Sequence, residues 1–385
     1  MKFTEEQILL QQMVDRFGRE QVQPLAAEID KEERFPYETW EKLADLGLLG
    51  VGIPEEYGGS GGGLVEECIV SEGIARYCVS TASSWISHTD LCMSNINRNG
   101  SHEQKNRWLP DLGSGKKIGG LAMTEPGAGS DVLGMSTRAV KDGDSFIVNG
   151  TKTFITNGPI GDIFIVYANT TPGAKAKGIT AFVVERGLPG FSTGKEFEKL
   201  GWHGSPTGEL IFEDCRVPLE NVLLEVNRGG EVLLSGLNSE RLVVAAESLG
   251  LARACLEESI IYAKQREQFG QPIAKFQMIQ ERLARMATKV EAAKAMIWSQ
   301  AIEMDEKGPS GMALETAASK LFASETAVEN ALDATQIFGG YGYTREFPVE
   351  RYLRDSRVLT IGAGTSEIMC HIIFRQLDKK FSGAI

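Results

Sequence analysis

The stretch from Gln336 to Glu367 reads QIFGGYGYTREFPVERYLRDSRVLTIGAGTSE and is the most informative part of the chain. Two glycine-bearing segments, QIFGG and IGAGTSE, lie on either side of RYLRD. Ala363 belongs to the second segment, and its methyl side chain cannot accept a proton. The meaning of this stretch depends on the segments that come before it.

Upstream of this stretch, apolar residues repeat at helical spacing. They step by threes and fours from Phe276 to Met304 without a break, and Lys307-Gly308-Pro309 then ends the pattern. So long a single stripe is typical of a bundle helix that packs on other helices, in the same subunit or in another.

The middle of the chain has a different residue pattern. From about Ile118, short β-branched and aromatic runs such as DSFIVNG, DIFIVYA, GITAFVVE and GELIFED are separated by Gly, Pro and Asn turns. This pattern predicts an all-β module that ends near Pro218.

The first third predicts helices. Thr4 and Gln7 have the spacing of a capping box. A glycine-rich loop at 52–63 interrupts the helical pattern, and polar punctuation at 97–101 and 113–115 closes the region. The order is therefore helical, then β, then helical.

Length and composition limit the classes of protein. A chain of 385 residues favours two or three domains. We predict an N-terminal helical domain at 1–117, a middle β domain at 118–225 and a C-terminal helical domain at 226–385. A net charge of −12 argues against nucleic acid as the main partner, but it does not exclude a nucleotide cofactor.

Targeting and metal signals are weak. No apolar run reaches about 18 residues, so no membrane insertion is expected. The N-terminus lacks the pattern of a signal or transit peptide, which favours a cytoplasmic protein. The six cysteines are scattered without a CxxC pair, so we expect reduced, buried thiols and no metal site.

Two general motifs have little support. No GxGxxG is present. GGSGG at 58–62 matches the GxSxG elbow of hydrolases, but a Pro-Glu-Glu-Tyr turn precedes it and a further glycine follows. Because that elbow needs a buried strand before it and a helix directly after it, a flexible loop is the better interpretation.

Two other segments are more specific. In MTEPGAGSDV, at 123–132, small residues after Pro126 let backbone amides approach a planar or anionic ligand closely. In KTFITNG, at 152–158, an aromatic residue precedes a threonine by two positions in a strand-like setting. Taken alone, the first can be a structural turn and the second a half-buried strand end.

Together these motifs resemble the acyl-CoA dehydrogenase family over essentially the whole chain. The branch that they most resemble is that of isovaleryl-CoA dehydrogenase. The resemblance implies an α+β multidomain fold with an N-terminal helical domain, a middle β-barrel or sandwich domain and a C-terminal four-helix bundle. The specific parts are MTEPGAGSD, KTFITNG, REQFG at 266–270, QIFGG, RYLRD, GTSEI, GFST at 190–193, ELIFEDC, SERLV and IGAGTSE.

The resemblance also implies that FAD binds between the β domain and the C-terminal helices. Met123 and Thr124 would meet the flavin ring, and Phe154, where tryptophan is usual, would cover its other side with Thr156. Ser130 would face the flavin pyrophosphate or the CoA chain. The residues implied to hold the ADP half of a neighbouring subunit's FAD, or to contact FAD elsewhere, are Arg266, Phe269, Gln336, Gly340, Thr365 and Glu367. Such sharing implies a homo-oligomer, commonly a dimer of dimers.

The implied reaction converts a short, branched or cyclic acyl-CoA into its 2-enoyl-CoA. A proton leaves the α carbon and a hydride passes from the β carbon to flavin N5. The backbone N–H of Ala363 would hold the thioester carbonyl. Electrons would leave through an electron-transfer flavoprotein.

The base must be a residue other than Ala363, which lies where most of the family carries its catalytic glutamate. Glu240 shares a helical stripe with Leu237 and Val244, so it lies on an otherwise apolar face. Such a carboxylate has an ionic partner or a function. The isovaleryl branch pairs a small residue in the C-terminal loop with a glutamate in the SERLV-type helix, as here. We therefore predict Glu240 as the base, and Arg241 as a residue that positions CoA or the base; a plain salt bridge is the alternative.

Asp90 is an alternative base. It stands in SHTDLC, where the isovaleryl pattern usually has asparagine, in a segment that the family folds near the acyl chain. Dehydrogenases of cyclic acyl-CoAs use an aspartate in this region as a base toward a remote ring carbon. Asp90 could equally be a solvated or capping residue. Trp202 and His203 also replace the family's usual Met-Arg, and a scaffold without turnover is a further alternative for the whole chain.

Overall fold

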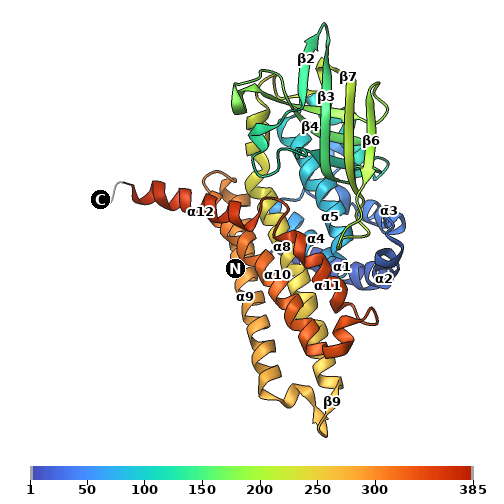
Figure 1. The fold of residues 1–385 in the computed structure, drawn as a ribbon, viewed down its shortest axis with the longest axis vertical. Helices are drawn as coiled ribbons and strands as arrows, with labels where there is room; N and C mark the ends of the chain where they lie inside the picture. Colours follow the sequence, from blue (N-terminus) through green and yellow to red (C-terminus); the bar gives the residue numbers. More distant parts are fainter. Residues whose placement is uncertain (1–2, 383–385) are drawn as a thin grey trace.

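The computed structural model describes residues 3–382, whose helices and strands form three successive groups (Figure 1). The first group is helical, as predicted. Its helices and short helical turns are α1 (Glu5–Phe17), η1 (Gly18–Val22), α2 (Gln23–Glu32), α3 (Tyr37–Asp45), η2 (Leu48–Gly50), η3 (Glu55–Tyr57), α4 (Leu64–Ala75), α5 (Val79–Ile86), η4 (Ser87–Met93), α6 (Ser94–Asn99) and α7 (His102–Gly113).

The second group contains the main sheet. Its strands are β1 (Gly119–Ala122), β2 (Arg138–Asp142), β3 (Ser145–Thr156), β4 (Ile163–Asn169), β5 (Ile179–Glu185), β6 (Phe191–Glu196), β7 (Thr207–Pro218) and β8 (Val222–Leu223). The helical turns η5 (Val132–Gly134), η6 (Lys175–Gly178) and η7 (Leu219–Asn221) lie between them.

The third group is a helical bundle. Its elements are α8 (Gly229–Gln265), the short hairpin β9 (Glu267–Gln268) and β10 (Gln271–Pro272), η8 (Ile273–Lys275), α9 (Gln277–Lys307), α10 (Ala313–Phe338), η9 (Gly339–Tyr343), α11 (Val349–Leu359) and α12 (Ser366–Phe381). Figure 1 shows α12 extending sideways from the bundle, with the sheet at the opposite end of the long axis from the hairpin.

Local sequence signals explain several helix ends. Thr4 caps α1 in a reciprocal capping box with Gln7, as predicted. The stripe predicted from Phe276 to Met304 forms α9, which ends at Gly308. The polar residues at 97–101 were expected to end the helical pattern. This was only partly correct, because α6 continues to Asn99 before the chain turns. The domain boundaries at 117 and 225 stay predictions.

The sheet separates two apolar cores. Its strands run in the order β6-β7-β3-β2-β4-β5-β8, and β1 pairs in parallel with β4. Because successive strand residues point to opposite faces, Phe164 and Val166 of β4 face the core of the β domain. Ile165 and Tyr167 face the other way, toward Trp108 and its neighbours from the N-terminal helices. The β module is therefore fixed against the first domain.

The helix α8 lies at the centre of the molecule. Its middle part is buried on all sides, as is typical of a helix enclosed by others. It packs on α10 within the bundle and on α4 of the first domain. Any ionisable side chain that α8 carries in this region is therefore held between two domains.

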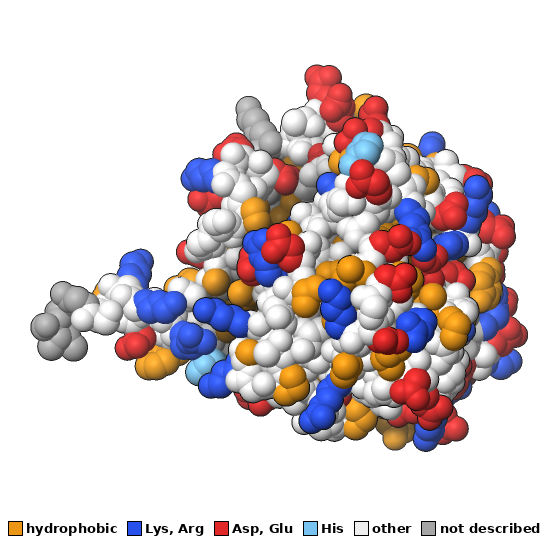
Figure 2. All heavy atoms as spheres, turned by 90° about the horizontal axis from the view of Figure 1, so that it is seen from above, with side chains coloured by type: hydrophobic (Ala, Val, Ile, Leu, Met, Phe, Trp, Pro, Cys, Tyr) orange, Lys and Arg blue, Asp and Glu red, His pale blue; other side chains and the backbone are white. Residues whose placement is uncertain are grey.

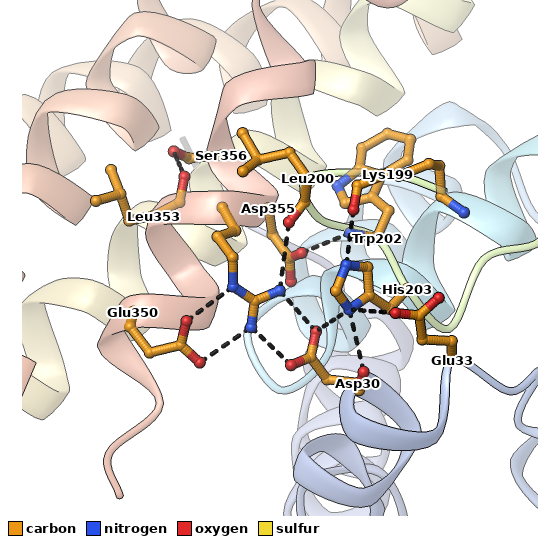
Figure 3. Close-up of polar contacts among 11 residues, drawn as sticks. Asp30, Glu33, Lys199, Leu200, Trp202, His203, Glu350, Leu353, Asp355 and Ser356 are labelled. Atoms are coloured by element: carbon orange, nitrogen blue, oxygen red, sulfur yellow. Dashed lines mark hydrogen bonds and ion pairs between the residues drawn. The ribbon is translucent and has the colours of Figure 1, made fainter. Parts of the chain in front are cut away.

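A polar network ties three distant segments together (Figure 3). Arg354 of α11 donates hydrogen bonds of 2.9 and 2.6 Å to the carboxylate of Asp30 in α2. In the β6–β7 connection, the Trp202 N–H donates to Asp355 Oδ1 (2.7 Å) and His203 Nδ1 lies 3.2 Å from Asp30 Oδ1. Trp202 and His203 thus serve to join the β domain to both helical domains.

Some features concern the described residues as a whole. Across residues 3–382, no helix combines the length and apolarity needed to cross a membrane, and no group of side chains is arranged to hold a metal ion. Five of the cysteines are buried, as expected, but Cys370 is exposed on α12, so the prediction was wrong for that thiol. Figure 2 shows acidic and basic side chains mixed over the body, with basic ones on the projecting α12.

Candidate active site

The segments MTEPGAGSD and KTFITNG meet at one edge of the sheet. Thr124 follows β1, and its carbonyl accepts a hydrogen bond from the N–H of Thr153 in β3 (2.9 Å). The carbonyl of Met123 accepts one from Lys152 Nζ (3.0 Å). The structure therefore places Met123 and Thr124 beside the strand that carries Phe154, as their predicted common role requires.

A buried ion pair holds this junction. Lys152 Nζ lies 2.8 Å from Glu125 Oε1, and the two side chains are 0% and 2% exposed. Glu125 also accepts hydrogen bonds from Ser136 and Thr137. Burial acts to raise the pKa of Glu125, but the charge of Lys152 and these donors outweigh it and lower the pKa to about 2. We call Lys152 and Glu125 the Lys152 pair.

Phe154 is an apolar ring left uncovered beside this junction. Its side chain is 64% exposed, and its backbone has a φ of 57°, in the left-handed region. It stacks on Phe197 at a centroid distance of 4.9 Å. A left-handed, exposed phenylalanine is unusual in a strand and indicates a constrained surface that a planar apolar ligand could cover.

A groove of about 520 Å³ lies at the far end of the bundle. Arg266 lines it, with its guanidinium 5.8 Å from the centre of the Tyr341 ring. Gly339 and Gly340 leave it open, because a Cβ at either position would meet nothing within 4 Å. Arg266 and Gly340, predicted to bind the ADP half of FAD, thus share one groove. Phe269, 93% exposed, lies in the adjacent hairpin turn, and Gln336 is exposed at the end of α10.

The loop that contains Ala363 is held from α10. Ala363 and Gly364 both have left-handed backbones, with φ values of 52° and 92°. Lys320 is fully buried, and its Nζ donates to the Gly364 carbonyl at 2.6 Å. Burial, with the positive charge of Arg241, lowers the pKa of Lys320 to about 8. The lysine that holds the Ala363 loop therefore lies within electrostatic range of Arg241 on α8.

Glu240 is a buried carboxylate, 8% exposed, on α8, a helix that packs on both α4 and α6. Burial raises its pKa, and the charges of Arg98 and Arg241 oppose this effect. The nearest cation is Arg98 of α6, with Nη2 at 4.0 Å from Oε1. The apolar stripe around Glu240 predicted either a function or a salt bridge. In the structure, Glu240 is a buried acid whose ionic partner Arg98 lies 4.0 Å away.

Two further carboxyl groups, Asp90 and Glu67, are buried, and Asp90 responds to the charges of both Glu67 and Glu240. Asp90 in η4 is fully buried, and neither of its oxygens has a hydrogen-bond partner. Burial, together with Glu67 and Glu240, raises the pKa of Asp90 well above its usual value. Burial also raises the pKa of Glu67 in α4 to about 7. We call Glu67, Asp90, Glu240 and Arg98 the acid cluster.

The remaining predicted residues lie nearer the surface. Ser130 is exposed in the loop before η5. Thr365 caps α12, where its side chain accepts from the Ile368 N–H at 3.2 Å, and Glu367 is exposed in the first turn of that helix. Arg241 is 8% exposed, donates weakly to Asn238 Oδ1 at 3.4 Å and leaves its Nε without a partner.

Sequence reasoning did not find the residues that support these groups. Those missed are Glu67, Arg98, Glu125, Lys152 and Lys320. One signal was present in the sequence, because Asp90, Ser94 and Arg98 are spaced four residues apart and so share a helical face. The contacts of Lys152 and Lys320 depend on chain segments that no local pattern brings together.

Comparison with known proteins identifies the family. Family models match three successive parts of the chain: the N-terminal domain of acyl-CoA dehydrogenase at 4–116, the middle domain at 120–215 and the C-terminal domain at 227–377. The chain belongs to the acyl-CoA dehydrogenase family. Members of this family are FAD-dependent oxidoreductases, and so is this acyl-CoA dehydrogenase.

Individual relatives agree along the full length. The mitochondrial isovaleryl-CoA dehydrogenase of Pongo abelii is 46% identical over 382 residues, covering 98% of this chain and 90% of its own. Among solved structures, butyryl-CoA dehydrogenase from Megasphaera elsdenii has a TM-score of 0.95 at 38% identity, with 98% and 99% of the two chains covered. An FAD complex of PigA has a TM-score of 0.94 at 31% identity, with 98% of each chain covered. The predicted family and fold are therefore confirmed.

The geometry fits FAD. The exposed ring of Phe154 beside Met123 and Thr124 suits an apolar, planar ring system. The open groove with Arg266 and Gly340 suits an anionic or polar nucleotide portion, because it combines a cation with accessible backbone. A Cβ added at Gly127 or Gly129 would meet no other atom within 4 Å, so there is room for a ligand over the MTEPGAGSD turn.

Proposed function

We propose that this acyl-CoA dehydrogenase oxidises a short, branched or cyclic acyl-CoA to its 2-enoyl-CoA, with Glu240 as the α-proton base. FAD, when bound, would supply the acceptor for the hydride that leaves the β carbon. The observation that carries the proposal is the burial of Glu240 on α8. The next residue, Arg241, acts by its charge on Lys320, which holds the loop of Ala363. The similarity to isovaleryl-CoA dehydrogenases supports a short, branched acyl group.

Each of the predicted site residues would have a separate role in the reaction. The N–H of Ala363, in a loop held by Lys320, would donate to the thioester carbonyl and so acidify the α proton. Glu240 would take that proton, and its raised pKa makes it a stronger base than an exposed glutamate. Arg241 would help to position CoA or the base.

Glu240→Gln tests this role. Removing a positioned base costs about 10²–10⁴-fold in turnover, so flavin bleaching by isovaleryl-CoA should slow by that factor while FAD stays bound. Glu247→Gln is the matched control: Glu247 lies two turns later on α8, is buried, has a pKa raised to about 8 by burial, and accepts from Ser83 Oγ. Unchanged bleaching in Glu240→Gln would refute the assignment.

A second candidate rests on Asp90. Its buried carboxyl without a hydrogen-bond partner suits a group that acts on the substrate, so the enzyme could use Asp90 as base on a ring carbon of a cyclic acyl-CoA. Asp90→Asn, assayed with isovaleryl-CoA, butyryl-CoA and cyclohexanecarboxyl-CoA, separates the two. Loss of activity confined to the cyclic thioester would favour the cyclic enzyme. Rates unchanged from wild type on all three thioesters would exclude it.

We also propose a homo-oligomer, with a dimer of dimers as the expected form. Phe269 and Tyr343 are 93% and 94% exposed beside the groove, and Phe374 on the projecting α12 is 67% exposed. Apolar side chains so exposed mark surfaces that a second copy would cover. An electron-transfer flavoprotein stays the predicted electron acceptor, and a cytoplasmic location also stays a prediction, because named relatives include mitochondrial enzymes.

A further inference from the structure

One helical face carries three polar residues toward the buried carboxyl groups. Asp90, Ser94 and Arg98 follow one another at intervals of four along η4 and α6. Ser94 Oγ donates to Glu67 Oε1 in α4 (3.3 Å), and Arg98 Nη2 approaches Glu240 Oε1 in α8 at 4.0 Å. This face therefore bridges the two helices that enclose the acid cluster.

A glycine makes the approach of Arg98 to Glu240 possible. Gly236 lies one turn before Glu240 on α8, and a Cβ there would be 2.3 Å from Arg98 Nη2 and 2.6 Å from Glu240 Oε1. Glycine inside a helix is destabilising relative to alanine. The close approach of these two groups gives a physical reason for glycine at this position.

The ionisable groups around Glu240 come from several elements. Arg98 is the one cation at ion-pair distance from it among residues 3–382, and Arg98 has no second ion pair in that range. The other ionisable groups that act on Glu240 or respond to its charge are Arg241 on α8 itself, Asp90 in η4 and Tyr167 in β4. Glu67 in α4 acts on Asp90. Carboxyl groups therefore crowd a site where only Arg98 approaches as a counter-charge from another element.

We propose that Arg98 is a positioning residue for Glu240, which it keeps ionised and therefore able to accept the substrate's α proton. The inference rests on the proposed role of Glu240. A separation of 4.0 Å is too long for a hydrogen bond, so the guanidinium acts through its charge. A short bidentate pair would instead occupy both carboxylate oxygens. The charge of Arg98 favours the carboxylate form of Glu240, and the distance leaves the carboxylate oxygens available to a C–H proton.

The pH dependence of kcat tests this role. Removing the charge should raise the pKa of Glu240, so the acidic limb of the profile should move to higher pH in Arg98→Met, by about 1–3 units. Arg98→Lys keeps the charge, so its acidic limb should lie close to that of wild type. The matched control is Arg107→Met on α7, a surface arginine paired with Glu185 and Glu220, which should leave the limb unchanged. The probe is isovaleryl-CoA with the FAD-loaded enzyme.

A second measurement does not depend on turnover. Infrared difference titration of wild type against Glu240→Gln should report protonation of the Glu240 carboxyl at higher pH in the Arg98→Met background. If Arg98→Met does not fold, Gly236→Ala replaces it, because a methyl group there must push Arg98 and Glu240 apart and should shift the limb in the same direction by less. An unshifted limb and titration in the folded variant would overturn the proposal.

The two proposals can fail separately. If Glu240→Gln keeps full activity, Glu240 is not the base and the proposed function fails in that respect. If Glu240→Gln is inactive while the profiles of Arg98→Met and wild type coincide, Glu240 remains the base and only the role of Arg98 is refuted.

Discussion

The Lys152 pair and the acid cluster are both buried and charged, yet they are built in opposite ways. In the Lys152 pair, one cation meets one anion at 2.8 Å, and Glu125 receives further donors. In the acid cluster, one arginine acts by its charge on three carboxyl groups and approaches only Glu240, at 4.0 Å. Both oxygens of Asp90 lack a hydrogen-bond partner. One arrangement is complete within the chain, and the other is not.

The difference indicates two purposes. A satisfied buried pair fixes local geometry, and the Lys152 pair fixes the turn that follows β1 against β3, beside the predicted flavin site. Buried polar groups without partners destabilise a fold, so they tend to persist where function requires them. The acid cluster is accordingly the place where we expect the reacting part of the substrate to lie.

Lys152→Met should cause the largest loss of stability. Breaking a buried pair by removing one partner costs about 3–5 kcal/mol, since Glu125 is then left uncompensated. Denaturant unfolding of the FAD-loaded protein would measure it, and FAD retention should fall as well. Lys307→Met, which removes an exposed pair with Glu303, is the control and should cause no measurable loss. If Lys152→Met lost as little stability as Lys307→Met, the Lys152 pair would not stabilise the fold.

The two regions should respond to pH in opposite directions. The pKa of Glu125 is lowered to about 2, so its contribution is present above its ordinary value of 4.5 and is lost as pH falls toward 2. The pKa of Glu67 is raised to about 7, so its contribution is present below 4.5 and is lost as pH rises through 7. Each shift corresponds to at most about 3 kcal/mol.

Unfolding free energies between pH 5 and 8 would check this contrast. Wild type should lose stability across that range through Glu67, and Glu67→Gln should show a flatter dependence. Identical slopes in the two proteins would mean that Glu67 is ionised in the folded state.

Asp90→Asn should have the smallest effect on stability. Because the Asp90 carboxyl has no hydrogen-bond partner to lose and burial raises its pKa, which favours the uncharged form that asparagine mimics, the change should stay within about 1 kcal/mol. Thermal unfolding of the two proteins would measure it. A loss close to that of Lys152→Met would show that Asp90 has a stabilising partner and would remove the contrast between the regions.

Much of the fold was predictable from local patterns. The apolar period from Phe276 to Met304 predicted α9, and the capping box at Thr4 predicted the start of α1, because both signals lie within single elements. The burial of Glu240 also followed from its apolar stripe. The polar residues at 97–101 were interpreted as the end of a helical segment, whereas α6 continues to Asn99 and Arg98 approaches the buried Glu240 on α8.

The supporting residues of the site could not be predicted in the same way. Lys320 reaches the Gly364 carbonyl, and Lys152 reaches Glu125, only because distant segments pack together. A buried lysine in a helix or strand gives no local signal of its partner. The sequence thus indicated which residue could act as base, while the electrostatic setting of that base required the structure.

The central claim is that Glu240 removes the α proton, and deuterium exchange tests it most directly. The FAD-loaded enzyme is incubated anaerobically with isovaleryl-CoA in D₂O, and deuterium at C2 of the recovered thioester is measured by mass spectrometry. The account predicts exchange in wild type and in Glu247→Gln, and a loss of about 10²-fold or more in Glu240→Gln. Exchange in Glu240→Gln at the wild-type rate would contradict it.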